Sequence, residues 1–154
     1  MTVNVIDDQD RSFDRESLVS LAEMVLASEG FPSETGVDIT AVTDVAIEQL
    51  HVTHMGLAGP TDVLSFPLEA LTRGEVPEIR AGQAPIHLGD VVLAPDYIAR
   101  QAERLDVAFA DEMALMVVHG ILHLMGWDHE DDAEAEQMEA RERALLAKVG
   151  VDRR

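Results

Sequence analysis

Cysteine is absent from this 154-residue sequence, and aromatic residues make up only 4% of it. The absence of cysteine excludes disulfides, cysteine-held zinc or iron–sulfur clusters and a cysteine nucleophile, so any metal ion must be bound by nitrogen or oxygen ligands. Positive charge is also scarce: 11 Lys and Arg face 30 Asp and Glu, which gives a formal net charge of −19 at pH 7. Such a charge repels polyanions at long range and opposes unspecific binding to nucleic acids and anionic membranes.

Long apolar runs are missing as well. No apolar stretch reaches the roughly 18 residues that suggest a membrane-spanning helix. The N-terminal sequence MTVNVIDDQD carries acidic residues where a signal peptide needs positive charge. We therefore expect a soluble cytoplasmic protein with no membrane partner. The length and an apolar content of 47% predict one globular domain over residues 1–154.

The order of the periodic segments predicts an α+β domain with about four strands in a mixed sheet and about five helices. Alternating or continuous apolar residues predict strands around 3–5, 37–41, 61–66 and 87–94. Apolar residues three and four apart predict helices over 13–29, from Thr43 or Asp44 to about 50, and over 95–105, 113–125 and 130–149. About twenty residues separate the last two strands, and a connection of that length is either mobile or functional.

The helix predicted over 113–125 is apolar on nearly every side, which places it in the core. Asp111 and Glu112 precede it, and we interpret them as the acidic opening of this helix. The final helix begins with a run of acidic residues from Glu130. We interpret this run as a solvated surface, with a patch that binds a cation or a partner as the alternative.

Three of the six histidines, His119, His123 and His129, fall within the eleven residues HGILHLMGWDH. Helix positions four apart lie roughly 5–6 Å from each other on one face, so His119 and His123 can direct imidazole nitrogens at one ion. Gly126 tolerates the positive φ that ends a helix, so the chain can turn back and deliver His129. Because unpaired buried imidazoles are costly, the pattern predicts a metal site with three nitrogen ligands.

Nitrogen ligands in a tetrahedral arrangement suit zinc, and nickel, copper and manganese are also compatible with them. Three protein ligands leave a fourth position for water, which is typical of catalytic zinc. The spacing also matches the histidines and the glycine of the metalloprotease pattern HExxHxxGxxH, but Gly120 stands where that pattern has its glutamate. Peptide hydrolysis therefore lacks its general base at the expected position.

The motif HGILHLMGWDH resembles the HGxLHLxGxDH signature of the YbeY family, bacterial endoribonucleases of ribosomal RNA maturation. The segments PTDVLSFP (60–67) and LGDVVLAP (88–95) are similar to two further family blocks and follow in the same order. The resemblance implies a zincin-like fold, one zinc ion per chain bound by the three histidines, and metal-dependent cleavage of single-stranded RNA. It also implies action on the 3′ end of 16S ribosomal RNA and in ribosome quality control, with ribosomal proteins or an assembly GTPase as partners. No DNA partner is expected.

One position departs from the family pattern. The family commonly has an arginine seven residues before the Asp of PTDVLSFP, and this sequence has Met55 there, with Ala58 where an Asp is frequent. That arginine is usually credited with contacting the RNA backbone or the transition state, and methionine offers neither charge nor bidentate hydrogen bonds. Either Met55 simply packs and catalysis is weakened, or another cation enters the site. The candidate cations are Arg73, Arg80, Arg100 and Arg104.

A general base is not identified by the sequence. Asp128 is adjacent to His129 and either orients a ligand imidazole or caps the turn after Gly126. Ser65 and Phe66 are candidates to line a groove for an extended RNA strand, with Phe66 either stacking on a base or packing in the core.

The other aspartates and histidines near these motifs are expected to have structural roles or to lie on the surface. Asp62 and Asp90 lie in strand segments and are expected to be hydrogen-bonding residues of the fold, with a catalytic role as the alternative. His51, His54 and His87 fit no spacing of metal ligands. His54 is interpreted as a surface residue, with contact to the substrate as the alternative.

Three functional hypotheses follow. The first is a zinc-dependent endoribonuclease of single-stranded ribosomal RNA, with weak and salt-sensitive RNA affinity that relies on protein partners for placement. The second is a ribosome-assembly factor whose metal mainly folds the motif and which cleaves little, a hypothesis that Met55 keeps open. The third is a metallohydrolase of other substrates, peptides included.

Overall fold

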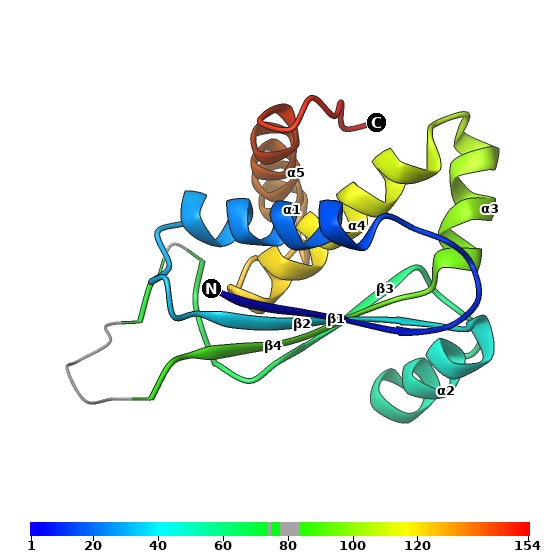
Figure 1. The fold of residues 1–154 in the computed structure, drawn as a ribbon, viewed down its shortest axis with the longest axis horizontal. Coiled ribbons are helices and arrows are strands. Elements are labelled where there is room, and N and C mark those ends of the chain that lie inside the picture. The colour runs from blue at the N-terminus through cyan, green and yellow to red at the C-terminus, as the bar shows by residue number, and fades with distance from the viewer. Residues whose placement is uncertain (74, 78–83) are drawn as a thin grey trace.

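The computed structural model describes residues 1–73, 75–77 and 84–154 (Figure 1). The predicted α+β class is confirmed, with four strands and five helices in these ranges. Arg80, one of the candidate cations, lies outside the described residues. In chain order the elements are β1 (Thr2–Asp8), α1 (Arg15–Ser28), β2 (Gly36–Val42), α2 (Asp44–Met55), β3 (Val63–Pro67), β4 (His87–Leu93), α3 (Pro95–Leu105), α4 (Phe109–Leu124) and α5 (Asp132–Ala147).

The sheet has the strand order β1-β2-β4-β3 and is mixed, as predicted. β1, β2 and β4 run parallel, and β3 pairs antiparallel with β4 at one edge. α1, α4 and α5 lie on one side of the sheet, whereas α2 lies under one end of the other side (Figure 1). Among the described residues, no helix covers the rest of that second side.

The main apolar core lies between the sheet and α1, α4 and α5, and α4 is its centre. Nearly every residue of α4 from Met113 to Leu124 is buried, as its continuous apolar sequence predicts. A smaller apolar cluster lies between α2 and the opposite side of the sheet, and its buried members are Val42, Ile47, Leu64, Val92 and Ala94. The histidines of α4 are thus carried by a helix fixed on several sides.

α4 begins at Phe109, four residues before the predicted start at Met113. Its N-cap, Ala108, makes no side-chain capping hydrogen bond, so this end has no capping signal in the sequence. Asp111 and Glu112 lie in the first turn of α4, as interpreted, and Glu112 is buried, with only 1% of this residue exposed. Its carboxylate accepts hydrogen bonds from Gln101 and Arg154.

No single helix within the described ranges has both the length and the apolar composition to cross a membrane. α3 and α4 meet that test together, but the pair is bent by 117°.

Candidate metal centre

Two of the three clustered histidines, His119 and His123, lie on the half of α4 that packs against β3 and β4. The close approach depends on Gly120, because a Cβ there would lie 2.7 Å from a methyl group of Val91. The hydroxyl of Ser65 donates a hydrogen bond to the Gly120 carbonyl at 2.9 Å, which ties β3 to the helix. The position that holds glutamate in the metalloprotease pattern is therefore a packing contact between helix and sheet.

The end of α4 turns back at Gly126, as the sequence predicts. Gly126 has φ +93°, and its N–H donates to the His123 carbonyl, while the Trp127 N–H donates to the Leu122 carbonyl. This pair of bonds is the Schellman arrangement that closes a helix with a left-handed residue. A Cβ on Gly126 would also lie 2.1 Å from the Leu71 carbonyl oxygen. The glycine is needed for its φ and for this close approach, and it brings His129 back toward the helix.

The three imidazoles converge on one point. One ring nitrogen from each of His119, His123 and His129 lies within 4.8 Å of the other two. The Nε2 atoms of His119 and His123 are 3.0 Å apart. The His129 ring centroid is 5.5 Å from that of His119 and 5.0 Å from that of His123. His129 is the exposed member of the group, and the other two are half-buried.

The Nδ1 atoms of both helical histidines have partners on the protein. His119 Nδ1 is 2.7 Å from Glu142 Oε2, and His123 Nδ1 is 2.9 Å from the Trp127 carbonyl oxygen. Burial alone would raise the pKa of Glu142, but hydrogen bonds from His119 and Arg153 outweigh it and lower this pKa. The Glu142 side chain is therefore ionised and can only accept the hydrogen bond with His119 Nδ1. The Trp127 carbonyl oxygen likewise can only accept the hydrogen bond with His123 Nδ1. Both Nδ1 atoms consequently donate, and the two Nε2 atoms face each other.

Burial, together with the neighbouring His119 and His129, lowers the pKa of His123 to about 4. His123 is therefore neutral at pH 7 and directs an Nε2 lone pair at the Nε2 of His119. The two Nε2 atoms lie 3.0 Å apart, close enough for one cation to contact both. This donor set fits a metal ion held by three imidazole nitrogens.

Glu142 is the functional residue that the sequence analysis missed. It lies on α5, 1% of it is exposed, and its second oxygen accepts a hydrogen bond from Arg153 Nε at 2.9 Å. A signal was present in the sequence: Glu142 shares one helical stripe with the buried residues Met138, Leu145 and Leu146. An acidic residue within an apolar stripe has to find a buried partner, and here that partner is a histidine of the metal centre.

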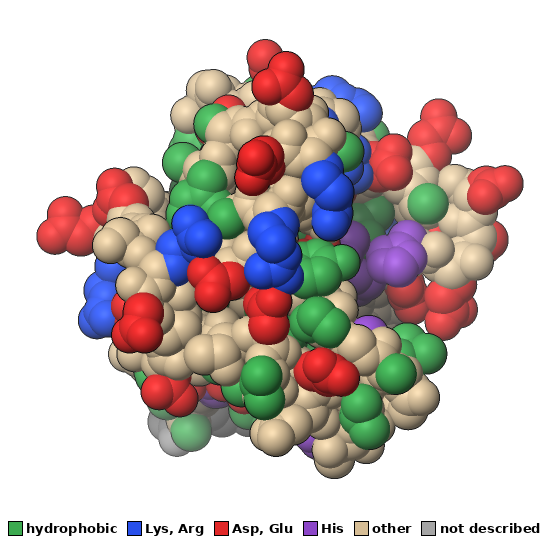
Figure 2. Space-filling view, turned by 90° about the vertical axis from the view of Figure 1, so that its right-hand side faces the viewer, with side chains coloured by type: hydrophobic (Ala, Val, Ile, Leu, Met, Phe, Trp, Pro, Cys, Tyr) green, Lys and Arg blue, Asp and Glu red, His purple; other side chains and the backbone are tan. Residues whose placement is uncertain are grey.

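A cavity of about 690 Å³ opens beside the three histidines. Its walls come from β3, the end of α2, the residues after β3 and the turn after α4. Figure 2 shows histidine side chains on the right of this face, with acidic side chains beyond them. Asp62, Glu69 and Asp128 contribute carboxylates to the lining, and Met55 lies at its rim with 52% of its surface exposed.

Ser65 and Phe66, the two residues of β3 that were candidates to line an RNA groove, lie in different surroundings. Ser65 lines the cavity, and its hydroxyl is hydrogen-bonded to α4. Phe66 is not part of the cavity wall. It packs partly buried against the smaller apolar cluster and makes an edge contact with His54 at 5.0 Å between ring centroids. Neighbouring residues of a strand point to opposite faces, so Ser65 and Phe66 do not share a groove.

The two aspartates near the site make defined hydrogen bonds. Asp128 Oδ1 accepts from the His129 backbone N–H at 2.8 Å, which fixes the turn that delivers this histidine. Asp62 accepts from the Val63 N–H at 2.7 Å and from Gln101 at 3.1 Å. Both carboxylates therefore support the backbone or a neighbouring helix while also lining the cavity.

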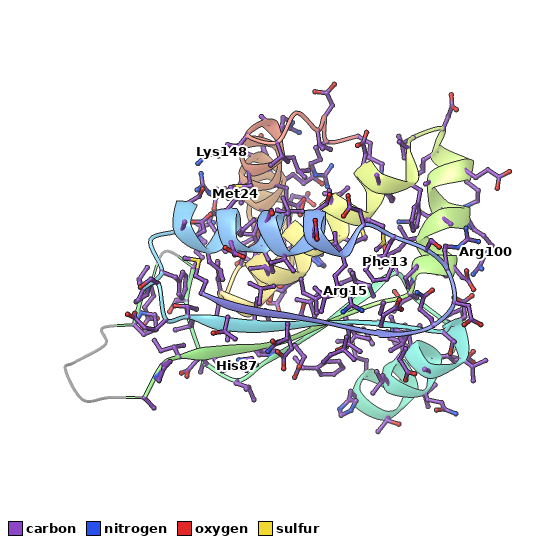
Figure 3. All side chains as sticks on the ribbon, in the orientation of Figure 1. Phe13, Arg15, Met24, His87, Arg100 and Lys148 are labelled. Carbon is purple, nitrogen blue, oxygen red and sulfur yellow. The ribbon has the colours of Figure 1, made fainter. Side chains whose placement is uncertain are left out.

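Among the described candidate cations, Arg73 is the one that contacts the cavity wall. Its guanidinium lies 5.5 Å from the ring centroid of Trp127, which lines the cavity. Arg100 instead pairs with Asp44 at the start of α2 and stacks on Tyr97 (Figure 3). Arg104 lies in the last turn of α3.

The remaining histidines occupy separate places. His51 lines the cavity, and its Nδ1 lies 3.0 Å from the Gly59 carbonyl oxygen. His54 is exposed at the end of α2 against Phe66. His87 was expected to fit no metal-ligand spacing, yet its ring nitrogen lies close to carboxylate oxygens of Asp38 and Asp90.

Comparisons with known proteins agree with this architecture. The family model described as Endoribonuclease YbeY matches residues 4–150. A protein named Endoribonuclease YbeY from Moorella thermoacetica is 42% identical over 142 residues, which cover 90% of each chain. A protein of the same name from Mycolicibacterium vanbaalenii is 35% identical, over 99% of this chain and 82% of its own. The solution structure of TM1509 from Thermotoga maritima has a similar fold, with a TM-score of 0.61 at 24% identity, over 96% of this chain and 91% of its own.

Proposed function

This chain belongs to the YbeY family, and from that premise we propose that it is a metal-dependent endoribonuclease of single-stranded RNA. We further propose that its substrate is ribosomal RNA, with maturation of the 16S 3′ end and ribosome quality control as its role. The observation that carries the proposal is the convergence of His119, His123 and His129 beside a cavity wide enough for a nucleotide. Zinc, one ion per chain, is the metal proposed for this donor set.

A bound zinc ion would supply Lewis-acid polarisation of a phosphoryl oxygen and a lowered pKa for bound water, both of which assist phosphodiester cleavage. The protein fixes the ligands that surround it. Glu142 and the Trp127 carbonyl accept the Nδ1 protons of the two helical histidines, which orients both Nε2 atoms so that they would be available to the ion. His129 is exposed and leaves the approach from the cavity open.

The cavity is acidic, whereas RNA is anionic. Asp62, Glu69 and Asp128 line it, and the described part of the lining contains no lysine or arginine. Arg73, stacked on Trp127 at the wall, is the cation placed to contact a phosphate near the metal. Met55 adds an apolar surface at the rim. We propose weak RNA affinity for the isolated protein, with ribosomal proteins or an assembly GTPase placing it on its substrate in the cytoplasm.

The test is an RNA cleavage assay with zinc-loaded protein. We expect cleavage of single-stranded RNA that is lost with a chelator and with His123→Ala, and retained by the control His54→Ala, which removes an exposed histidine outside the cavity. Metal analysis should give zinc bound at the three histidines, and His119→Ala or His123→Ala should remove it. Cleavage that survives both the chelator and His123→Ala would come from a contaminating nuclease and would contradict the proposal.

One observation favours a second candidate, a ribosome-assembly factor with little catalytic activity. Met55, which stands where the resemblance to the family places an arginine, is half-exposed at the cavity rim and carries no charge. Full zinc loading without RNA cleavage would support this candidate. Turnover of a peptide by the zinc-loaded protein would instead support a metallohydrolase of another substrate class, although Gly120 places a packing contact where the protease glutamate would stand.

A further inference from the structure

A second cluster of metal-binding side chains lies on the side of the sheet opposite to α4. It consists of Asp38 on β2 and His87 and Asp90 on β4. One ligand atom from each lies within 4.8 Å of the other two, and all three residues are partly buried. Figure 3 places His87 under the sheet, where α2 does not reach. The cluster is therefore accessible from solvent and separate from the three-histidine centre.

Strand register brings the two carboxylates together. Asp38 and Asp90 are direct partners on neighbouring parallel strands. Like charges directly opposite each other in a sheet destabilise it, so this pair needs compensation. Asn4 on β1 donates a hydrogen bond to Asp38 Oδ1 at 2.9 Å, while Asp38 Oδ2 lies 3.6 Å from His87 Nε2. One oxygen of Asp38 is thus held by the sheet, and the other is directed toward the cluster.

An irregularity in β4 puts His87 on the same face as Asp90. Residues three apart in a regular strand point to opposite faces. Here Gly36 pairs with His87 and Asp38 pairs with Asp90, so β4 has one extra residue between the two pairs. Gly89 within this stretch has φ +135°, which a residue with a side chain rarely adopts. Such bulges redirect a side chain, and this one turns His87 toward the two aspartates.

The His87 ring also depends on the glycine that faces it. A Cβ on Gly36 would lie 3.0 Å from His87 Nδ1, so a side chain at this position would push the ring away. With glycine there, the ring lies over β2 with Nε2 on the Asp38 side. Glycines at 36 and 89 therefore permit the arrangement of all three ligands.

We propose that Asp38, His87 and Asp90 bind a second divalent transition-metal ion, independently of the three-histidine centre. One imidazole nitrogen and two carboxylates form a mixed donor set that suits Zn²⁺, Mn²⁺ or Co²⁺, with water filling the positions on the open side. The ion compensates the two facing carboxylates and joins β2 to β4 across the bulge. The proposal concerns binding and does not depend on the proposed nuclease function.

The test counts Zn²⁺ ions per chain after equilibrium dialysis against Zn²⁺. We expect about two ions in the wild-type protein and about one in His87→Ala, and Asp90→Asn should lose the same ion. His54→Ala, which removes an exposed histidine from neither cluster, should keep both. Because binding to the folded state alone stabilises it, added Zn²⁺ should also raise the melting temperature of His123→Ala, and His87→Ala in that background should abolish the increase.

The variants separate failure of this proposal from failure of the proposed function. One ion per chain that is lost in His123→Ala and kept in His87→Ala would overturn the second site and leave the three-histidine centre intact. One ion that is lost in His87→Ala and kept in His123→Ala would support the second site and contradict the first. Far-UV circular dichroism of each variant checks that lost binding does not come from lost folding.

Discussion

At the scale of single residues, His123 is the histidine whose protonation the fold suppresses most clearly. In the metal-free protein we expect its imidazole to titrate at a pKa of about 4, chiefly because of burial, against an ordinary value of 6.5. The unfolded chain then binds this proton more readily than the folded one between these values. His123 therefore lowers the free energy of unfolding as the pH falls from 6.5 to about 4, with no further loss below.

NMR titration of the His123 ring protons in metal-free protein measures that pKa directly. His54, which is exposed, serves as the internal comparison in the same spectra. A midpoint for His123 at or above 6.5 would contradict the inferred neutral state.

Glu142 should control how tightly the metal is held. Removing the acceptor of a ligand histidine typically costs 10–100-fold in metal affinity, so we expect Glu142→Ala to weaken zinc binding by about that factor. Glu142→Gln keeps an acceptor oxygen and should weaken it less. The control Glu136→Gln removes an exposed acidic residue of the same helix. Competition against a chromophoric chelator measures the affinities, and equal affinity in all four proteins would show that Glu142 does not position His119.

The sequence predicted the site residues that lie close together along the chain. It missed those that tertiary structure brings together from distant segments. His119, His123 and His129 lie within eleven residues, so helix geometry and one glycine were enough to group them. Glu142 reaches His119 from another helix, and the acidic composition of α5 favoured a solvated interpretation. His87 was not grouped with the two aspartates for a different reason. The bulge in β4 places its side chain on the face opposite to the one that a regular strand would give it.

At the scale of elements, the turn after α4 is the part that completes the three-histidine centre. Gly126→Ala would place a non-glycine residue at φ +93° and a methyl group 2.1 Å from the Leu71 carbonyl oxygen. Gly150→Ala is a matched control, since its φ is +74° and nothing lies within 4 Å of the added Cβ. The control should lose roughly 1–2 kcal/mol of stability from left-handed strain alone.

We expect Gly126→Ala to lose more stability than this control and also to bind zinc more weakly, because His129 moves with the turn. Urea unfolding and zinc competition measure the two effects. If zinc affinity in Gly126→Ala equals that of Gly150→Ala, the turn does not set the position of His129.

Periodicity predicted every strand and helix, because each element buries one side against the sheet or the helices. It did not place the start of α4, where Ala108 offers no capping side chain. Nor did it show that Glu112 is buried, since its partners Gln101 and Arg154 come from other parts of the chain. Boundaries and buried polar contacts depend on tertiary packing, which a local pattern does not contain.

At the scale of the whole molecule, a net charge of −19 leaves few cations to bind RNA. If Arg73 contacts one phosphate, Arg73→Ala should raise KM several-fold with little change in kcat. It should also make the slope of log K against log salt shallower by about 0.7, the value for one phosphate of a single strand. Arg73→Lys should keep most of the slope, and Arg15→Ala, an exposed arginine on α1, should keep all of it (Figure 3).

RNA binding by fluorescence anisotropy over a salt series provides these slopes. If the salt dependence of RNA binding is the same in Arg73→Ala as in the wild-type protein, another group contacts the phosphate. The role of Arg73 would then be limited to its contact with Trp127.

The packing of α4 has a consequence for any experiment that alters the histidines it carries. Its apolar side chains are buried between the sheet and other helices, and this core contains none of the three histidines. Replacing His119 or His123 is therefore expected to leave the burial of the helix intact. Such variants report on what the imidazoles bind, because the architecture that carries them is held by other side chains.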